Sequence, residues 1–330
     1  MKSENFKNFI AKKNKDKILF TAGPASLSIE NIKGLGPCFG RGDKDYLKIE
    51  KRVLNQLKKI SGHKKIITTQ GSGSTALEIT ALNFLYGNVL IIDTGFYSER
   101  LFKLAKFAMK THKKIKKVDK LNWTKFSKFK KKKIDWVWAC VTETSRGLKI
   151  PIKELKIFSK KVNAKLALDA TASIGLEKDH NLAEVVSFSS CKGLMGLTGA
   201  CFVSYNIRPK NKVDSFVLNI KNLEKKKMTG PYHTIQSLDE VLKNFKKMQR
   251  AIIINKNKTL NKYKSSLLYD LKNQPLLCTY TKKKITSKNK RVLLYKPRLN
   301  LSGSVICHLG EAHLGKNAKG KIIDFLEDND

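Results

Sequence analysis

Two neighbouring stretches decide the fold of this chain, LALDATASIG (166–175) and SSCKGLMG (189–196). Each follows or ends an apolar run of strand length, and each places a charged residue, Asp169 or Lys192, at that strand's end. A carboxylate there is half-buried and needs a partner, because burying an unpaired charge is costly. A lysine there can be desolvated, which lowers its pKa and frees its amine for covalent chemistry. The pair indicates a site at strand ends, although Asp169 alone is equally suited to cap a helix.

Outward from these stretches, short apolar runs alternate with amphipathic segments between residues 17 and 205. The expected strands are 17–21, 65–70, 88–94, 109–117, 135–143, 165–170, 185–190 and 200–205. The expected helices are 46–61, 74–86, 98–108 and 152–161. Strands that alternate with helices, several of them continuously apolar, predict an α/β fold with a parallel or mostly parallel sheet covered on both faces.

The pattern changes after about Asn244. A long helix is expected from Leu238 to Ile254 and beyond, followed by short strands, which indicates a smaller C-terminal α+β domain. The sequence therefore predicts a polar N-terminal segment (1–16), a large domain (17–245) and a small domain (246–330).

Charge and cysteine content narrow the class of protein. The chain has 67 Lys and Arg against 27 Asp and Glu, a net charge of +40, yet only eight of the basic residues are Arg. The lysines are spread along the whole chain rather than gathered with aromatics, so we expect salt-dependent, non-specific attraction to polyanions and no specific nucleic-acid site. No run reaches the ~18 apolar residues that a membrane helix needs. The six cysteines are scattered without metal-ligand spacing, and we expect a cytoplasmic protein without a structural metal.

Three further polar clusters follow expected strands. The stretch QGSGSTALE (70–78) places small and hydroxyl residues at a helix start, where backbone amides favour an anion. Taken alone, this pattern is more often ordinary capping. The stretch DTGFYSER (93–100) offers an aromatic that could lie against a planar ligand or simply belong to the core. The stretch TETSRG (142–147) is a cluster of hydroxyls that could reach a ligand or form a plain polar loop.

The order and spacing of these clusters is the specific signal. Together with FTAGPASLS (20–28), CFGRGDKDY (38–46) and TGPYHT (229–234), the sequence resembles the class V branch of fold-type I pyridoxal-5′-phosphate (PLP) enzymes. Within it, the chain is most similar to the 2-aminoethylphosphonate–pyruvate and alanine–glyoxylate aminotransferases. The resemblance runs from residue 20 to about 240 and implies a mostly parallel mixed sheet sandwiched by helices, with a smaller C-terminal domain.

The resemblance also assigns roles to residues. Lys192 would form a Schiff base with PLP and Asp169 would pair with the ring nitrogen. The other cofactor-binding residues would be Tyr97 stacked on the ring, Thr144 at its edge, and Ser72, Gly73, Ser74 and Ser189 at the phosphate. Thr229 would reach the phosphate of a neighbouring subunit, which implies a homodimer with shared active sites.

One departure concerns the substrate. The family carries an arginine near its C-terminus that binds the substrate's acid group, and the best-matching stretch here, SVICHLG (304–310), has Val305 in its place. Arg298 or Arg41 could substitute, because bidentate recognition of an acid favours arginine over lysine.

The resulting hypothesis is an aminotransferase that moves an amino group from a small amine, 2-aminoethylphosphonate first, to a small oxo acid such as pyruvate. Alternatives within the class are alanine or serine aminotransferases using glyoxylate or pyruvate, and a PLP lyase if the acid-binding group is lost. An alternative outside the class is a polyanion-binding protein on a degenerate enzyme scaffold, driven by the lysines.

Overall fold

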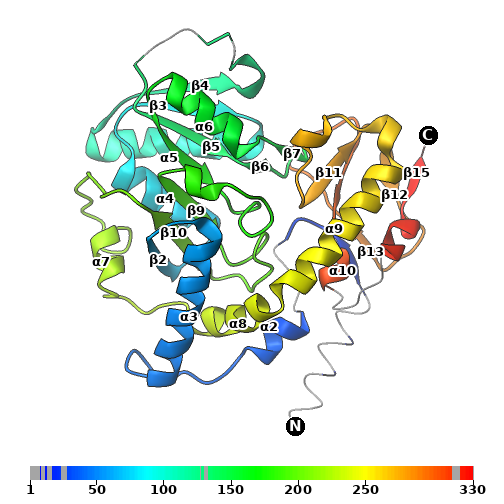
Figure 1. Ribbon diagram of the computed structural model, residues 1–330, viewed down its shortest axis with the longest axis horizontal. Helices are drawn as coiled ribbons and strands as arrows, with labels where there is room; N and C mark the ends of the chain where they lie inside the picture. Colours follow the sequence, from blue (N-terminus) through cyan, green and yellow to red (C-terminus); the bar gives the residue numbers. More distant parts are fainter. Residues whose placement is uncertain are drawn as a thin grey trace.

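The computed structural model describes residues 8, 12, 17–23, 28–126, 128–129, 133–313 and 320–329 (Figure 1). Most of the predicted N-terminal segment 1–16 thus lies outside the described residues. The helices are α2 Ile29–Lys33, α3 Lys44–Ser61, α4 Gly73–Phe84, α5 Phe96–His112, α6 Ile152–Lys161, α7 Ile220–Glu224, α8 Tyr232–Lys243, α9 Phe245–Lys262 and α10 Gly310–His313. The strands are β1 Ile18–Phe20, β2 Lys65–Gln70, β3 Gly87–Asp93, β4 Ile115–Asn122, β5 Trp136–Cys140, β6 Thr142–Glu143, β7 Leu148–Lys149, β8 Lys165–Asp169, β9 Val185–Ser189, β10 Ala200–Tyr205, β11 Cys278–Thr281, β12 Lys284–Thr286, β13 Val292–Leu294, β14 Ser304–Cys307 and β15 Glu327–Asn329.

A seven-stranded sheet forms the centre of the large part of the chain. Its order is β2-β10-β9-β8-β5-β3-β4, and β10 alone runs antiparallel to its neighbours. The carboxyl ends of the parallel strands β2, β3, β5, β8 and β9 therefore meet along one edge, where the polar clusters of the sequence follow them. The expected mostly parallel mixed sheet is confirmed.

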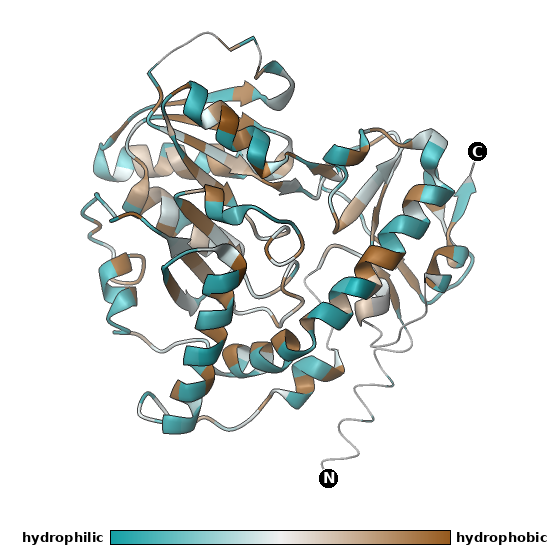
Figure 2. Ribbon diagram, in the orientation of Figure 1, coloured by the Kyte–Doolittle hydropathy of each residue, from teal (hydrophilic) through white to brown (hydrophobic). Residues whose placement is uncertain are grey.

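Helices cover both faces of this sheet because its strands are apolar on both sides. Trp136 and Trp138 of β5 pack with α4 and α5 on one face, while Val137 and Ala139 pack with α3 and α6 on the other. Successive residues of a strand point to opposite faces, so one continuously apolar strand supplies two cores. Figure 2 shows that helices bordering solvent, such as α3 and α9, carry both hydrophilic and hydrophobic residues along their length.

The C-terminal part forms a separate group of small sheets beside α9. Strand β11 pairs with β14, and β12 pairs with β15, both antiparallel. Strand β1 pairs in parallel with β13, so the N-terminal Ile18–Phe20 packs with the C-terminal part and not with the central sheet. The boundaries at residues 16 and 245 stay a prediction.

Three expected elements need correction. The strand expected at 109–117 is wrong, because α5 continues to His112 and the strand starts at Ile115. The strand expected at 17–21 exists as β1 but does not join the central sheet. The long helix expected from residue 238 is two helices, α8 and α9, which meet at Asn244. Within the described residues, no helix has the length and apolar character that crossing a membrane requires, and no cluster of His, Cys, Asp and Glu is arranged for a metal.

An ion pair joins α3 to α8 beneath the sheet. Arg52 binds Asp239 through two hydrogen bonds, Nε to Oδ1 at 2.7 Å and Nη2 to Oδ2 at 2.6 Å, and Lys243 lies 3.3 Å from the same carboxylate. Burial by itself would raise the pKa of Asp239, but the bonds from Arg52 outweigh it and hold this pKa below its ordinary value. The side chain of Arg52 is 46% exposed, so solvent screens part of the interaction.

We expect Asp239→Asn to lower the free energy of unfolding at neutral pH by about 1–2 kcal/mol. Because the folded pKa is depressed, the contribution is present above the ordinary Asp pKa of about 4 and is lost as the pH falls through the folded pKa. Urea unfolding should therefore give converging stabilities for the variant and the natural protein in acid. Asp45→Asn, which breaks an exposed pair with Lys48, is the control and should change little. A pH-independent difference would contradict the assignment.

Candidate active site

The loop after β2 forms a small cup at the start of α4. Ser72 is the N-cap, and Gly73 and Ser74 are the first two residues of the helix. A side chain at Gly73 would not fit, because its Cβ would lie 2.7 Å from Thr171 Oγ1. The first amides of a helix lack intrahelical partners, so this arrangement favours an anion. The geometry suits an anion, and the role of Ser72, Gly73 and Ser74 in holding a phosphate stays a prediction.

The loop after β3 brings an aromatic and an arginine to the same place. Tyr97 is the second residue of α5, and Arg100 lies one turn further along. The Arg100 guanidinium carbon lies 5.0 Å from the centre of the Tyr97 ring, and its Nη1 donates to Ser74 Oγ at 2.9 Å. Arg100 therefore links the predicted stacking residue to the predicted phosphate cup and adds a positive charge between them.

Asp169 is the last residue of β8 and is 6% exposed. Its Oδ1 accepts a hydrogen bond from the amide of Thr171 at 2.9 Å, but residues 171–176 form turns and no helix, so the helix-capping alternative is wrong. Burial raises the pKa of Asp169, while Thr171, Lys192 and Arg100 act in the opposite direction. Within the described residues no ion pair reaches this carboxylate, although Lys192 and Arg100 lie near enough to act on its pKa.

Lys192 follows β9 in an unusual backbone conformation. Its φ is 71°, and that of Met195 is 57°, both in the left-handed region that residues other than glycine rarely adopt. The turn is held by hydrogen bonds from Met195 N to Lys192 O at 3.0 Å and from Gly193 N to Thr171 O at 3.2 Å. Such strain persists where the surroundings impose it, often at functional sites. The result is that Lys192 Nζ lies 4.6 Å from the centre of the Tyr97 ring.

Two further predicted residues, Ser189 and Thr144, carry hydroxyl groups at the ends of β9 and β6. Ser189, the last residue of β9, is buried with its Oγ 3.5 Å from Cys191 Sγ. Thr144 follows β6 and is 1% exposed. Its Oγ1 makes no close hydrogen bond to a described residue, and the side chain of Tyr295 interacts with it more loosely. A buried hydroxyl so placed can also bind a ligand or water.

The C-terminal part completes the site with a residue that sequence analysis did not identify. Tyr295 is a neighbour of both Thr144 and Tyr97, and its burial raises its pKa. Val305 lies on β14 opposite Tyr280 and is 3% exposed, so it supplies no polar group. Arg298 lies with its guanidinium carbon 5.3 Å from the Phe96 ring, next to Tyr97.

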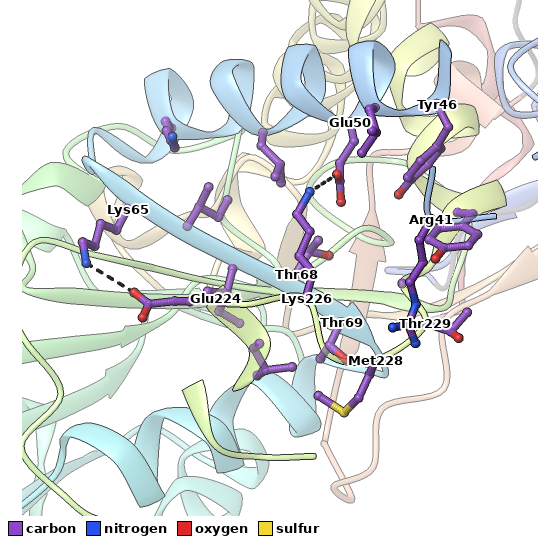
Figure 3. Close-up of a pocket in the computed structure, with 18 of the residues that line it drawn as sticks. Arg41, Tyr46, Glu50, Lys65, Thr68, Thr69, Glu224, Lys226, Met228 and Thr229 are labelled. Carbon is purple, nitrogen blue, oxygen red and sulfur yellow. Dashed lines mark hydrogen bonds and ion pairs between the residues drawn. The ribbon is translucent and has the colours of Figure 1, made fainter. Parts of the chain in front are cut away.

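Thr229 and Arg41 lie outside the group of residues around Lys192. Both line a cavity of about 460 Å³ along the edge of β2, together with Tyr46 and an ion pair between Glu50 and Lys226 (Figure 3). Lys192 and Asp169 do not line it. The backbone oxygen of Thr229 accepts from Gln70 Nε2 at 3.4 Å, just ahead of the cup, and its predicted contact with a neighbouring subunit stays a prediction.

The structure thus brings together eight of the nine predicted site residues along the strand ends, apart from Thr229. It adds Arg100, Thr171, Glu143 and Tyr295, which sequence analysis missed. Arg100 and Glu143 stood inside the quoted stretches DTGFYSER and TETSRG, and a preference for arginine in a lysine-rich chain was the available signal for Arg100. No sequence signal pointed to Tyr295, since its position depends on the packing of the C-terminal part.

Sequence comparisons give relatives at low identity. No family model matches the chain. It is 26% identical over 167 residues to a protein named "uncharacterized aminotransferase" from Helicobacter pylori strain J99, covering 48% of this chain and 45% of that protein. It is also 26% identical over 253 residues to a 2-aminoethylphosphonate–pyruvate transaminase from Pseudomonas putida strain KT2440, covering 69% and 68%. The chain thus spans about half to two thirds of the length of these relatives.

Solved structures share the whole fold. An alanine–glyoxylate aminotransferase from Nostoc superposes with a TM-score of 0.76 at 16% identity, covering 93% of this chain and 92% of that one. A phosphoserine aminotransferase from Cytophaga hutchinsonii superposes with a TM-score of 0.77 at 15% identity, covering 94% and 98%. The expected resemblance is confirmed: this chain is similar in sequence to the class V aminotransferases and has their fold.

Proposed function

We propose that this chain is a PLP-dependent aminotransferase. The observation that carries the proposal is the convergence of Lys192, Tyr97 and Asp169, which come from three different strand ends. The ammonium group of Lys192 lies against the Tyr97 ring, while Asp169 is a buried carboxylate close enough to Lys192 to feel its charge. An amine over an aromatic ring, with a buried acid nearby, fits a flat, cationic ring bound among them.

The residues present fit PLP in three independent ways. Asp169 is buried without an ion pair to a described residue, and a protonated pyridine nitrogen would supply a directly bonded cation. Thr144 brings a buried hydroxyl group beside Tyr295, which is itself a neighbour of Tyr97. Gly73 leaves a cradle that a Cβ would fill, beside the Arg100 that binds Ser74. In this arrangement Ser72, Gly73, Ser74, Ser189 and Arg100 would hold the phosphate, Tyr97 and Thr144 the ring.

When bound, PLP supplies an aldehyde that condenses with amines and a ring that accepts electrons. The chain's own groups do the rest. Lys192 would bind the aldehyde and would carry a proton to and from the substrate's amine-bearing carbon. The carboxylate of Asp169 would keep the ring nitrogen protonated. Tyr295 of the C-terminal part lies beside Thr144 and Tyr97 at this site.

For the amino donor we propose 2-aminoethylphosphonate, with pyruvate as acceptor. The support is the similarity to transaminases of that name over 69% of this chain. Val305, which is buried and supplies no group for an acid, favours the alternative of a lyase. Alanine or serine as donor, with glyoxylate or pyruvate as acceptor, is the other alternative. Arg298 beside Phe96 is the group of the C-terminal part placed to receive an acid. We further propose a homodimer in which Thr229 serves the neighbouring site.

A screen of amino donors tests this proposal. The purified protein, loaded with PLP, should be yellow, and 2-aminoethylphosphonate should remove the visible absorbance within one turnover, while pyruvate should restore it. Loss of the visible absorbance with alanine or serine, but not with 2-aminoethylphosphonate, would select the alternative donors. Release of ammonia without restoration by any oxo acid would select the lyase. A protein that stays colourless in excess PLP would overturn the proposal, and steep salt-dependent retention of DNA by that protein would select the polyanion alternative.

A further inference from the structure

Glu143, the last residue of β6, and Thr144, the first residue of the turn after it, have different tasks. Thr144 lies toward the predicted site, whereas Glu143 reaches the start of α5. Glu143 is 0% exposed. A fully buried carboxylate needs a reason, and its contacts supply one.

One oxygen of Glu143 holds the first turn of α5. Its Oε2 accepts from the amides of Tyr97 at 2.9 Å and Ser98 at 3.3 Å, and from Thr94 Oγ1 at 3.4 Å. These amides have no partner inside the helix, and a negative charge at a helix N-terminus is favourable. The other oxygen, Oε1, accepts from the amide and the hydroxyl of Ser145. Both oxygens are thus occupied, which fixes the carboxylate.

The residue before the helix is matched to this contact. Gly95 has φ 146°, which a side chain rarely allows, and a Cβ there would lie 3.2 Å from Glu143 Cδ and Cγ. Gly95 therefore leaves the room that Glu143 needs. Tyr97 and Arg100 both lie within the first turn and a half of the helix that this carboxylate anchors.

We propose that Glu143 is a positioning residue that sets the Tyr97 ring and the Arg100 guanidinium against the cofactor. This inference rests on the proposed PLP site. Glu143 is not one of the predicted cofactor-binding residues. It acts through the backbone of α5. The loop after β6 and the loop after β3 are thereby locked together, so that the hydroxyl of Thr144 and the ring of Tyr97 keep a fixed relation.

The test compares PLP binding by three variants. Glu143→Gln keeps the shape but removes the charge and replaces one acceptor oxygen by a donor NH2 group. Either the amides of Tyr97 and Ser98 or the amide of Ser145 then lose their acceptor. We expect the variant's Kd for PLP to rise about tenfold, the loss of one charged hydrogen bond. We also expect the visible circular dichroism of bound PLP to shrink or change sign, because the ring no longer lies in one orientation. Glu99→Gln, on the same turn but paired with exposed Lys120, is the matched control and should leave both unchanged.

If Glu143→Gln does not fold, Ser145→Ala keeps the carboxylate and removes only the hydroxyl that donates to its Oε1, while the amide of residue 145 remains. It should shift both readouts in the same direction by a smaller factor. A folded Glu143→Gln or Ser145→Ala with the natural Kd and dichroism would overturn the inference, even with a lowered melting temperature, since Glu143 would then only cap the helix. Failure of the natural protein to bind PLP would instead overturn the proposed function.

Discussion

Lys192→Ala is expected to abolish turnover, with a rate reduced by about four orders of magnitude because the same amine holds the cofactor and moves the proton. The variant should still bind PLP through the phosphate cup and Tyr97, but only by non-covalent contacts. Borohydride should then no longer fix PLP to the chain, whereas in the natural protein it should label Lys192 and no other of the many lysines. Its position 4.6 Å from the Tyr97 ring centre is the structural reason for this selectivity.

Lys160→Ala is the control for this experiment. Lys160 is exposed on α6, and its loss should change neither turnover nor labelling. Labelling of a different lysine in the natural protein would show that Lys192 is not the residue that binds PLP covalently. The strained backbone of Lys192 adds a second check, because a glycine there would relieve strain while removing the amine.

Asp169→Asn is expected to reduce turnover by about a thousandfold, since a neutral amide cannot keep the ring nitrogen protonated. Without PLP, the same substitution should not lower the melting temperature of the protein. Burial raises the pKa of Asp169, so the folded state keeps its proton to a higher pH than the unfolded chain does, and this carboxyl group lowers stability as the pH rises past the ordinary Asp pKa. At neutral pH the variant without PLP should therefore melt no lower than the natural protein.

The order of melting temperatures should reverse when PLP is added, because only the natural protein gains the ion pair with the ring. Thermal melts with and without PLP, at neutral pH and in mild acid, measure both effects at once. Asp214→Asn, an exposed carboxylate near Lys212, is the control and should shift neither melt. A natural protein that PLP stabilises no more than Asp169→Asn would contradict the role of the carboxylate.

The two predictions depend on different parts of the site, so they can fail separately. Lys192 is held by the turn after β9 and by the bond from Gly193 to Thr171, whereas Asp169 is fixed as the end of a central strand. Loss of either residue should leave the sheet intact because neither belongs to the two apolar cores.

The sequence by itself determined the large features of this protein. Continuously apolar runs such as 136–140 and 185–189 have to be buried on both faces, which requires helices on both sides of the sheet. Polar residues directly after those runs have to lie at one edge, so Asp169, Lys192 and Tyr97 were identifiable before their contacts were known. The local composition also fixed the C-terminal change of pattern.

Only the tertiary structure decided where chemically ambiguous segments go. The lysine-rich strand β4 is an edge strand with a partly exposed surface, so it shows no apolar run and was placed wrongly. The apolar Ile18–Phe20 looks like a sheet strand, yet its partner β13 lies more than 250 residues away in the sequence. The contacts of Glu143, Arg100 and Tyr295 likewise depend on which loops meet in space. Periodicity encodes burial, but the choice of partner is made by long-range packing that no local pattern contains.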